Sequence, residues 1–398
     1  MPMKPFTCMS NVLQDRSRSM SFSIRTTLVV IVLSSIIPLR AIALDVKFSS
    51  VAGDFVSVGN AVIGDGMIAF RALGEGREGV YAAREGEPLR TIADRDAFVP
   101  DSRDIKFSGF GDSPHVSERS VIFSAATVAD VQGVYLYDRG LVRRVIDSSM
   151  KVPGKDTLFA SFGQPSIDSV QMAFVGVYDG GQGVYRIANS RLYTIATIDT
   201  IMPQGGEEFR SFGHPHAGGG SVVFKGLSWN NEGIYIFNSA GFRVVADYAR
   251  PVPQAVGNFK KFGDPAVDGG YVVFKGVGGG RKGLYLFLNG ELSVVADDHT
   301  EAPGTTANFS DFASPSVDAG SVAFVGKVST QHGIYLYHRG VIYKVVDLYD
   351  TLEGQGIRSL SLSRQSLEGG AIVFRARLDD GSWGIYEARF ETAEAGSN

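Results

Sequence analysis

The chain has 398 residues, of which 44% are hydrophobic, 11% are aromatic and 20% are charged. This supply of apolar side chains can bury a large core, so the composition excludes an intrinsically disordered protein. A net charge of −4 creates no field that would attract nucleic acid or an anionic membrane, and we expect neither as a partner. The only cysteine is Cys8, so no internal disulfide or cysteine-based metal site is available.

Residues 1–43 have the features of a secretory signal peptide. An apolar run over 28–39 leads to the small-x-small pattern Ala41-Ile42-Ala43, which signal peptidase accepts. The run is too short to span about 30 Å of hydrocarbon as a helix. We therefore expect cleavage after about Ala43, a secreted or periplasmic protein, and no membrane span in the mature chain. A retained anchor or an organellar lumen is the alternative, and Met20 is an alternative start.

Two aromatic ladders show that the rest of the chain is built from seven repeats. A phenylalanine that ends a short apolar segment, and a tyrosine that follows a glycine and an aliphatic residue, both recur about every 50 residues. The phenylalanines are Phe70, Phe123, Phe174, Phe224, Phe274, Phe324 and Phe374, and the tyrosines are Tyr81, Tyr135, Tyr185, Tyr235, Tyr285, Tyr335 and Tyr386.

Each repeat contains four predicted strands, called A to D, as the sixth one illustrates. Its strands cover 315–317, 322–325, 333–337 and 341–346. β-Branched and aromatic residues fill these stretches, whereas glycine and aspartate occupy the turns between A and B and between C and D. No stretch has a sustained 3.6-residue apolar period, so we expect almost no helix after the signal peptide.

Seven units of about 50 residues with four strands each predict an all-β, seven-bladed β-propeller of four-stranded antiparallel blades over residues 44–391. Residues 392–398 form a polar tail. A solenoid is the alternative, but no polar capping repeat is present. The seventh unit lacks strand D, whereas residues 44–50 look like a strand without a blade. We predict that this N-terminal strand completes the last blade and closes the ring.

The repeat resembles the WD40-like repeat of TolB-type propellers. The segments 265–274 and 315–324 each carry a proline, then an aspartate turn, then an apolar strand ending in phenylalanine, with Gly-aliphatic-Tyr following. The tryptophan and serine that usually precede this proline are missing here. The resemblance implies a propeller fold, an extracytoplasmic location and a tendency to bind other proteins. The chain also resembles glycine-rich secreted repeat proteins of bacteria that have no assigned activity.

Five aspartates occupy one repeat position at the end of strand D: Asp94, Asp147, Asp247, Asp297 and Asp347. A ring of carboxylates is one way to bind Ca²⁺. Strand D is the outermost strand, however, so these groups should lie too far apart to share one ion. We expect each to cap its own inter-blade loop by accepting backbone N–H groups. Calcium bound within single blades is the alternative, and no other cofactor is expected.

Four cations directly follow the strand B phenylalanine, namely Arg71, Lys225, Lys275 and Arg375. On one face of the ring they would form an arc suited to phosphate or to a sulfated or uronic polymer. The alternative is that each pairs with a carboxylate of the neighbouring blade, which would offset the cost of burying the charge.

Two histidines, His115 and His216, follow the blade proline on what should be the innermost strand, and His214 lies two residues before the second. Imidazoles near a propeller axis are how metal-dependent lactonases and some lyases hold a metal. A metal site at the channel, held by His115 and His216, would make the protein a metal-dependent hydrolase or lyase.

The function that we favour from the sequence is a non-enzymatic, monomeric propeller. The loops between strands B and C, and those between blades, differ in every unit while the strands repeat, and surface loops are where binding residues gather. We expect these loops to form a rim that binds a protein or a polysaccharide. The metal-dependent hydrolase or lyase is the alternative.

Overall fold

The structure, a computed structural model, describes residues 46–51, 55–74, 77–204 and 206–390. Strands and turns make up all of this part, and it contains no helix. No segment within it could therefore cross a membrane as a helix. The predictions made for residues 1–43 and 392–398 lie outside the described residues.

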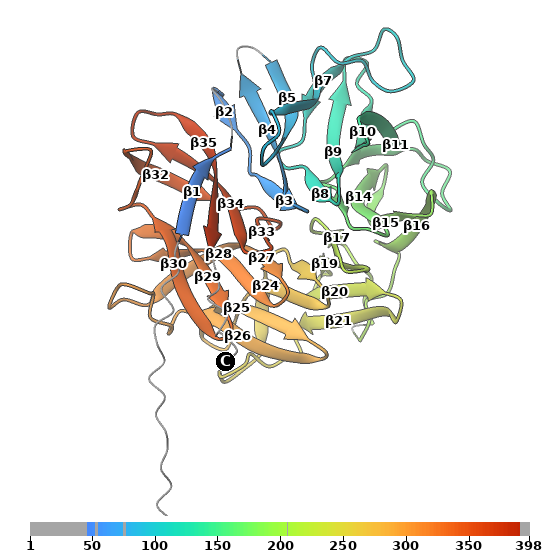
Figure 1. Ribbon diagram of the computed structural model, residues 1–398. Coiled ribbons are helices and arrows are strands. Elements are labelled where there is room, and N and C mark those ends of the chain that lie inside the picture. The colour runs from blue at the N-terminus through green and yellow to red at the C-terminus, as the bar shows by residue number, and fades with distance from the viewer. Residues whose placement is uncertain (1–45, 52–54, 75–76, 205, 391–398) are drawn as a thin grey trace, which may run out of the picture. The chain divides into compact units, whose positions relative to one another are not determined.

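Seven antiparallel sheets form the blades of a propeller, which confirms the predicted fold (Figure 1). In each blade the order from the innermost strand to the outermost is A, B, C and D, and strand A is broken in two in every blade except the sixth. Blade 1 comprises β2 (Ser57–Val58), β3 (Val62–Gly64), β4 (Met67–Gly74), β5 (Arg77–Arg84) and β6 (Arg90–Asp94). Blade 2 comprises β7 (Phe107–Phe110), β8 (His115–Ser117), β9 (Ser120–Thr127), β10 (Gln132–Asp138) and β11 (Leu141–Asp147).

The next three blades repeat this arrangement. Blade 3 comprises β12 (Phe159–Phe162), β13 (Ser166–Ile167), β14 (Met172–Tyr178), β15 (Gly181–Ala188) and β16 (Arg191–Thr197). Blade 4 comprises β17 (Ser211–Phe212), β18 (His216–Gly218), β19 (Ser221–Leu227), β20 (Glu232–Asn238) and β21 (Gly241–Asp247). Blade 5 comprises β22 (Phe259–Phe262), β23 (Ala266–Asp268), β24 (Tyr271–Gly278), β25 (Arg281–Leu288) and β26 (Glu291–Asp297).

The last two blades differ in strand A. Blade 6 has one continuous inner strand and comprises β27 (Phe309–Asp318), β28 (Ser321–Val328), β29 (Gln331–His338) and β30 (Val341–Asp347). Blade 7 comprises β31 (Thr351–Leu352), β32 (Gln355–Ser361), β33 (Leu367–Glu368), β34 (Ala371–Leu378), β35 (Trp383–Phe390) and, from the other end of the chain, β1 (Val46–Ser50).

The N-terminal strand closes the ring as predicted. β1 pairs antiparallel with β35 from Val46 opposite Phe390 to Ser50 opposite Tyr386, so it takes the place of strand D in blade 7. In Figure 1 the blue β1 lies beside the red β35. The ring of Phe48 meets that of Phe374 edge-on at 6.1 Å between centroids. Backbone pairing between the two ends of the propeller therefore holds the last blade complete.

Repeated aromatic side chains from neighbouring strands cluster on one face of the sheet, as blade 5 shows. In blade 5, Phe274 and Tyr285 are completely buried, and Phe259 meets Tyr285 edge-on at 4.9 Å. The prediction placed strand A of blade 6 at 315–317 only, but β27 starts at Phe309. The inner strand is longer than predicted because Phe309 and Phe312 also pair with strand B, on either side of the first of two register shifts.

Neighbouring blades share their hydrophobic cores. One buried cluster combines Val223 and Ile234 of blade 4 with Phe259, Phe274 and Tyr285 of blade 5. Each blade therefore buries both faces of its sheet, which explains why the strands are apolar almost throughout.

Strand order separates the connections onto two ends of the propeller. The loops between B and C and those between blades leave from one end of the strands, which we call the loop face. The turns between A and B and between C and D lie at the opposite end, which we call the turn face. Several inter-blade loops are small hairpins, since single bridges join Pro251 to Asn258 and Glu301 to Asn308.

Candidate functional site

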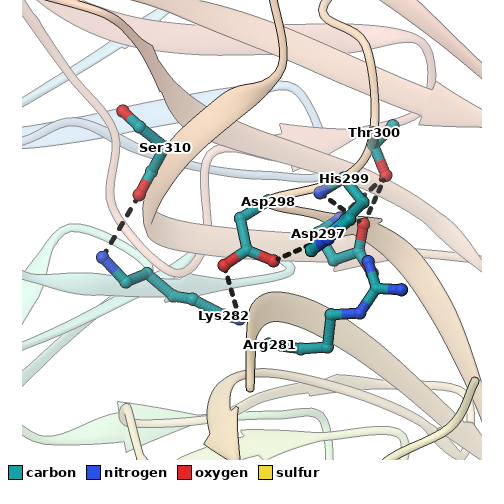
Figure 2. Close-up of polar contacts among 7 residues, drawn as sticks. All are labelled: Arg281, Lys282, Asp297, Asp298, His299, Thr300 and Ser310. Carbon is teal, nitrogen blue, oxygen red and sulfur yellow. Dashed lines mark hydrogen bonds and ion pairs between the residues drawn. The ribbon is translucent and has the colours of Figure 1, made fainter. Parts of the chain in front are cut away.

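The five aspartates at the end of strand D accept backbone N–H groups from the loop that follows. Figure 2 shows this for Asp297, whose Oδ1 accepts from the backbone N–H of His299 and from Thr300 Oγ1, both at 3.0 Å. In each of the other four, Oδ1 accepts the N–H two residues ahead at 2.9–3.0 Å: Asp94, Asp147, Asp247 and Asp347. This geometry ties the start of each inter-blade loop to its strand.

One of these aspartates belongs to a group that has the spacing of a metal site. Ligand atoms of Asp297, Asp298 and His299 lie within 4.8 Å of one another. Arg281 donates to Asp297 at 3.2 Å, and the backbone N–H of Lys282 donates to Asp298 at 3.2 Å (Figure 2). Protein donors therefore already occupy lone pairs that a cation would need, and the Arg281 guanidinium opposes a second positive charge.

Three of the four cations that follow the strand B phenylalanine face carboxylates of the next blade. Lys275 Nζ lies 2.6 Å from Asp311, and Lys225 Nζ lies 3.9 Å from Asp264. Arg71 is 3.6 Å from Asp112 in the next blade and 2.6 Å from Glu78 in its own.

The fourth cation, Arg375, donates to Ser361 Oγ at 2.9 Å and to the carbonyl of Val58 in blade 1 at 3.1 Å. In all four positions the cationic group thus joins neighbouring blades.

The two axial histidines come together in the structure. His115 on β8 and His216 on β18 are 3% and 5% exposed, and their Nε2 atoms are 3.1 Å apart. Ser166, on the inner strand of the blade between them, places its Oγ 3.1 Å from His115 Nε2. Residues from blades 2, 3 and 4 therefore form one buried polar cluster on the axis.

Hydrogen bonds to the Nδ1 atoms of both rings bear on whether the two histidines could bind a metal. The backbone N–H of Ile167 donates to His115 Nδ1, and that of Val267 donates to His216 Nδ1, both at 3.3 Å. Accepting Nδ1 atoms would put a proton on both Nε2 atoms, but a hydrogen bond between these two atoms at 3.1 Å needs one donor and one acceptor, so the contacts do not assign the same tautomer to both rings. A histidine that ligates a metal normally has the reverse arrangement, with the far nitrogen donating. As placed, both Nδ1 atoms face backbone N–H donors and the Nε2 atoms face each other, so neither ring has the acceptor on its far nitrogen that a metal-ligating histidine normally has.

Burial keeps both imidazoles neutral. It lowers the pKa of His115 to about 3, with a further contribution from the Arg364 guanidinium. Burial also lowers the pKa of His216 well below its usual value, and His115 and Arg364 act in the same direction. The cluster therefore carries no charge of its own at neutral pH.

A segment of blade 7 crosses the propeller axis, which the sequence analysis did not anticipate. Arg364 Nη1 donates to the carbonyls of His214 and Pro265, both at 2.9 Å, on the opposite side of the ring. The side chain of Gln365 accepts the backbone N–H of Val116 in blade 2 at 2.9 Å. Blade 7 thus plugs the channel with Arg364 and Gln365.

A signal for this plug was present in the sequence. Gln365 stands where blades 2 to 6 have proline. The register also shows that this strand is longer than the others. In blade 5, Phe262 and Val267 pair with β24 and are five residues apart. At the equivalent positions of blade 7, Leu360 and Leu367 pair with β34 and are seven residues apart. The additional length lets the segment bulge into the channel.

The plug separates two cavities. One, of about 380 Å³, opens on the loop face, and we call it the axial pocket. The other, of about 330 Å³, opens on the turn face, and Arg364 lines both. Every blade contributes one equivalent residue to the axial pocket. In blades 2 to 6 it is the residue directly before the proline. The seven residues are Asn60, Ser113, Gln164, His214, Asp264, Ser314 and Arg364. All seven are polar and hardly any two are alike, in contrast to the repeated positions around them.

The cavity on the turn face is lined by carboxylates that link the blades. Asp268 accepts the backbone N–H of Ala319 at 3.0 Å, and Asp318 accepts that of Gly369 at 2.8 Å. Asp168 and Glu368 make the same kind of bond to the turn of the next blade. These carboxylates have a structural role in holding adjacent turns together.

Comparison with solved structures identifies the same fold. The β-propeller domain of the Trilobed protease from Pyrococcus furiosus aligns with a TM-score of 0.54 at 10% identity, over 86% of this chain and 100% of that one. Pyrococcus horikoshii acylaminoacyl peptidase aligns with a TM-score of 0.53 at 11% identity, over 85% of this chain and 52% of the peptidase. A Mycobacterium tuberculosis puromycin-hydrolyzing peptidase aligns with a TM-score of 0.52 at 12% identity, over 88% of this chain and 56% of the peptidase.

These likenesses carry the fold and nothing more. The chain spans little more than half the length of the two peptidases. No curated protein matches its sequence. A family match, however, covers residues 32–231 and again 200–389, which together include all seven blades. The chain therefore belongs to the family of unknown function DUF7453.

Proposed function

We propose that this protein is a secreted or periplasmic binding protein without catalytic activity, and that its loop face docks a protein partner. The observation that carries the proposal is the concentration of exposed apolar side chains on that face. Scattered exposed hydrophobic residues are normal, but their gathering on one surface marks an interaction site.

The distribution of these side chains is uneven. Of sixteen large hydrophobic residues that are exposed in the described part of the chain, ten lie in inter-blade loops or in loops between B and C. The ten are Val56, Phe98, Val128, Met150, Leu158, Ile201, Trp229, Tyr248, Val256 and Tyr349. The strands beside these loops repeat from blade to blade while the loops differ, as expected where each loop contacts a different part of a partner.

Trp229 is the strongest candidate for an anchor. Its side chain is 78% exposed, and the Arg210 guanidinium lies over its ring at 4.1 Å from the centroid. Glu207, from the preceding inter-blade loop, braces the Trp229 loop by accepting from Ser228 Oγ at 2.6 Å and from the Asn230 N–H at 3.3 Å. Tryptophan and arginine are the residues most enriched in interface hot spots, and a braced loop loses less entropy on binding.

The extracytoplasmic location is part of the proposal. The signal-peptide pattern ending at Ala43 supports it, as does the resemblance of the repeat to TolB-type propellers. Expression of the full chain with intact-mass analysis of the product tests it: a mature protein that begins near Leu44 is expected. A product that retains residues 1–43 would contradict cleavage.

The binding proposal is tested by comparing two variants in a quantitative capture experiment. Wild-type protein, Trp229→Ala and Leu141→Ala are immobilised at equal density and incubated with envelope and culture extracts. Leu141 is 63% exposed at the start of strand D, away from the loop face, and is the matched control. We expect a protein that wild type and Leu141→Ala retain and Trp229→Ala loses, with at least tenfold weaker binding once that protein is purified.

Other outcomes contradict the proposal. Equal retention by all three proteins would exclude the Trp229 loop as the anchor. Binding to polysaccharides on a glycan array, with no protein retained, would replace the protein partner by a sugar polymer. The alternative of a metal-dependent hydrolase or lyase at the channel is tested separately by metal analysis. About one tightly held ion per chain, lost together with hydrolysis of generic esters on EDTA treatment, would favour the enzyme.

A further inference from the structure

The axial pocket combines features of a small-molecule site that are independent of the loop-face proposal. It has a volume of about 380 Å³, within the range of pockets that hold small ligands. All seven blades contribute a polar side chain at one repeat position, and the one from blade 7 is Arg364, which forms the floor; Lys275 and Ser363 also line the pocket. Repeat positions that need only pack tend to keep one residue type, so a ring of unlike polar residues around one cavity points to a ligand.

Arg364 is a partly buried cation that makes no salt bridge with the described residues, although the Asp264 charge acts on it. Its guanidinium donates to the carbonyls of His214, Pro215 and Pro265, and among the described residues none of its hydrogen-bond partners is an acid. Burial lowers its pKa, which reflects poor solvation of the charge. Neutral carbonyls offset only part of the cost of burying an ion, so the floor of the pocket favours an anion.

Asp264 supplies the complementary charge beside it. This residue lines the pocket and precedes Pro265, whose carbonyl Arg364 contacts. Asp264 Oδ1 is buried and accepts no hydrogen bond from the described residues, and Lys225 Nζ is 3.9 Å away. Burial and the Arg364 charge lower the pKa of neighbouring His214, so this imidazole is neutral and adds no competing cation. Because Oδ1 is enclosed while the side chain as a whole is 30% exposed, the pocket wall offers the remainder of the Asp264 carboxylate, in the same pocket as an arginine that makes no salt bridge.

We propose that the axial pocket binds a small zwitterion of the α-amino acid class. The ligand carboxylate would bind the Arg364 guanidinium, and its ammonium group, one carbon away, would donate to Asp264. An α-amino acid matches this pair because it carries both charges on a small molecule, and the guanidinium and the carboxylate line one pocket and act on each other electrostatically. The hydroxyls of Ser113 and Ser314 on other walls would face the ligand side chain.

The experiment measures binding to the full-length chain as the cell processes it. Each of the twenty proteinogenic amino acids is titrated by isothermal calorimetry up to 10 mM, and each amino acid that binds is compared with the carboxylic acid lacking its amino group. We expect one or a few amino acids to bind, and the matched acids to bind at least tenfold more weakly.

Two variants localise the site. Asp264→Asn keeps the shape of the side chain and removes its charge, so amino acid affinity should fall at least tenfold while affinity for the matched acid changes little. Ser314→Phe should fill the cavity and abolish binding of both without replacing Arg364. Asp156→Asn, 99% exposed in an inter-blade loop, is the matched charge control and should bind as wild type does. Circular dichroism verifies that each variant is folded.

The proposal is overturned if no amino acid binds wild type at 10 mM. It is equally overturned if binding occurs but folded Asp264→Asn and Ser314→Phe bind as tightly as wild type. Equal affinity for an amino acid and its matched acid would also refute it, because the site would then recognise a carboxylate only.

Discussion

Acidification should destabilise the propeller through His115, which is buried on the axis. Its pKa in the folded protein is lowered to about 3 by burial and by Arg364, whereas an unfolded chain leaves a histidine near its ordinary value of about 6.5. Between these values the unfolded state binds a proton that the folded state excludes. Stability contributed by the neutral imidazole is therefore present above about pH 6.5 and is lost as the pH falls towards 3.

The size of the effect follows from the two pKa values. Below about pH 6.5 one histidine of this kind changes the free energy of unfolding by about 1.4 kcal/mol per pH unit. Between pH 7.5 and 5.5 the loss from His115 alone is about 1.4 kcal/mol, because the unit from pH 7.5 to 6.5 lies above the unfolded pKa and contributes little. His216 adds a loss of the same sign, since its pKa is also lowered by burial.

Urea unfolding followed by circular dichroism at pH 7.5, 6.5 and 5.5, at constant ionic strength, measures this dependence. His115→Asn removes the titrating group, so its unfolding free energy should fall between pH 7.5 and 5.5 by about 1.4 kcal/mol less than that of wild type. The readout is the difference in pH dependence, so a lower stability of the variant at every pH does not obscure it. His299→Asn, at a side chain that is 61% exposed, should behave as wild type. The reasoning is refuted if His115→Asn and wild type lose stability equally on acidification.

Three further substitutions, one of them with a matched control, test the packing of the blades by urea unfolding at pH 7.5. Gly276→Ala should cost about 1–3 kcal/mol, since the added Cβ would lie 2.6 Å from the Phe259 ring, whereas Gly109→Ala, with nothing within 4 Å, should change stability by under about 1 kcal/mol. Equal costs would contradict the close approach. Lys275→Met removes a partly exposed inter-blade ion pair and should lower the free energy of unfolding by under about 1 kcal/mol. This cost should be smaller still in about 1 M salt, and a larger loss that does not depend on salt would contradict a weak, screened ion pair. Phe48→Ser should cost about 1 kcal/mol by weakening the closing strand, and no change would show that β1 contributes only its backbone.

The repeat was readable in the sequence because a blade is a local structure. Glycine and aspartate turns set the strand boundaries, and residues such as Phe274 and Tyr285 recur at one spacing since every blade must fill the same gap. Counting strands even predicted that β1 would complete blade 7, as the register with β35 confirms. Local patterns were less informative for strand A, where register shifts hide the alternation and the strand was predicted too short.

The axial chemistry depended on closing the ring. His115 and His216 are about one hundred residues apart, and only the curvature of seven packed blades brings their Nε2 atoms to 3.1 Å. The sequence placed both near the axis, but it contained no sign that their other nitrogens accept backbone N–H groups. Arg364 and Asp264 stood in the sequence as single polar residues before a turn of the repeat. They line one pocket because each blade is rotated relative to the one before it until the ring closes. This rotation is a property of the whole ring and cannot be seen in any single repeat.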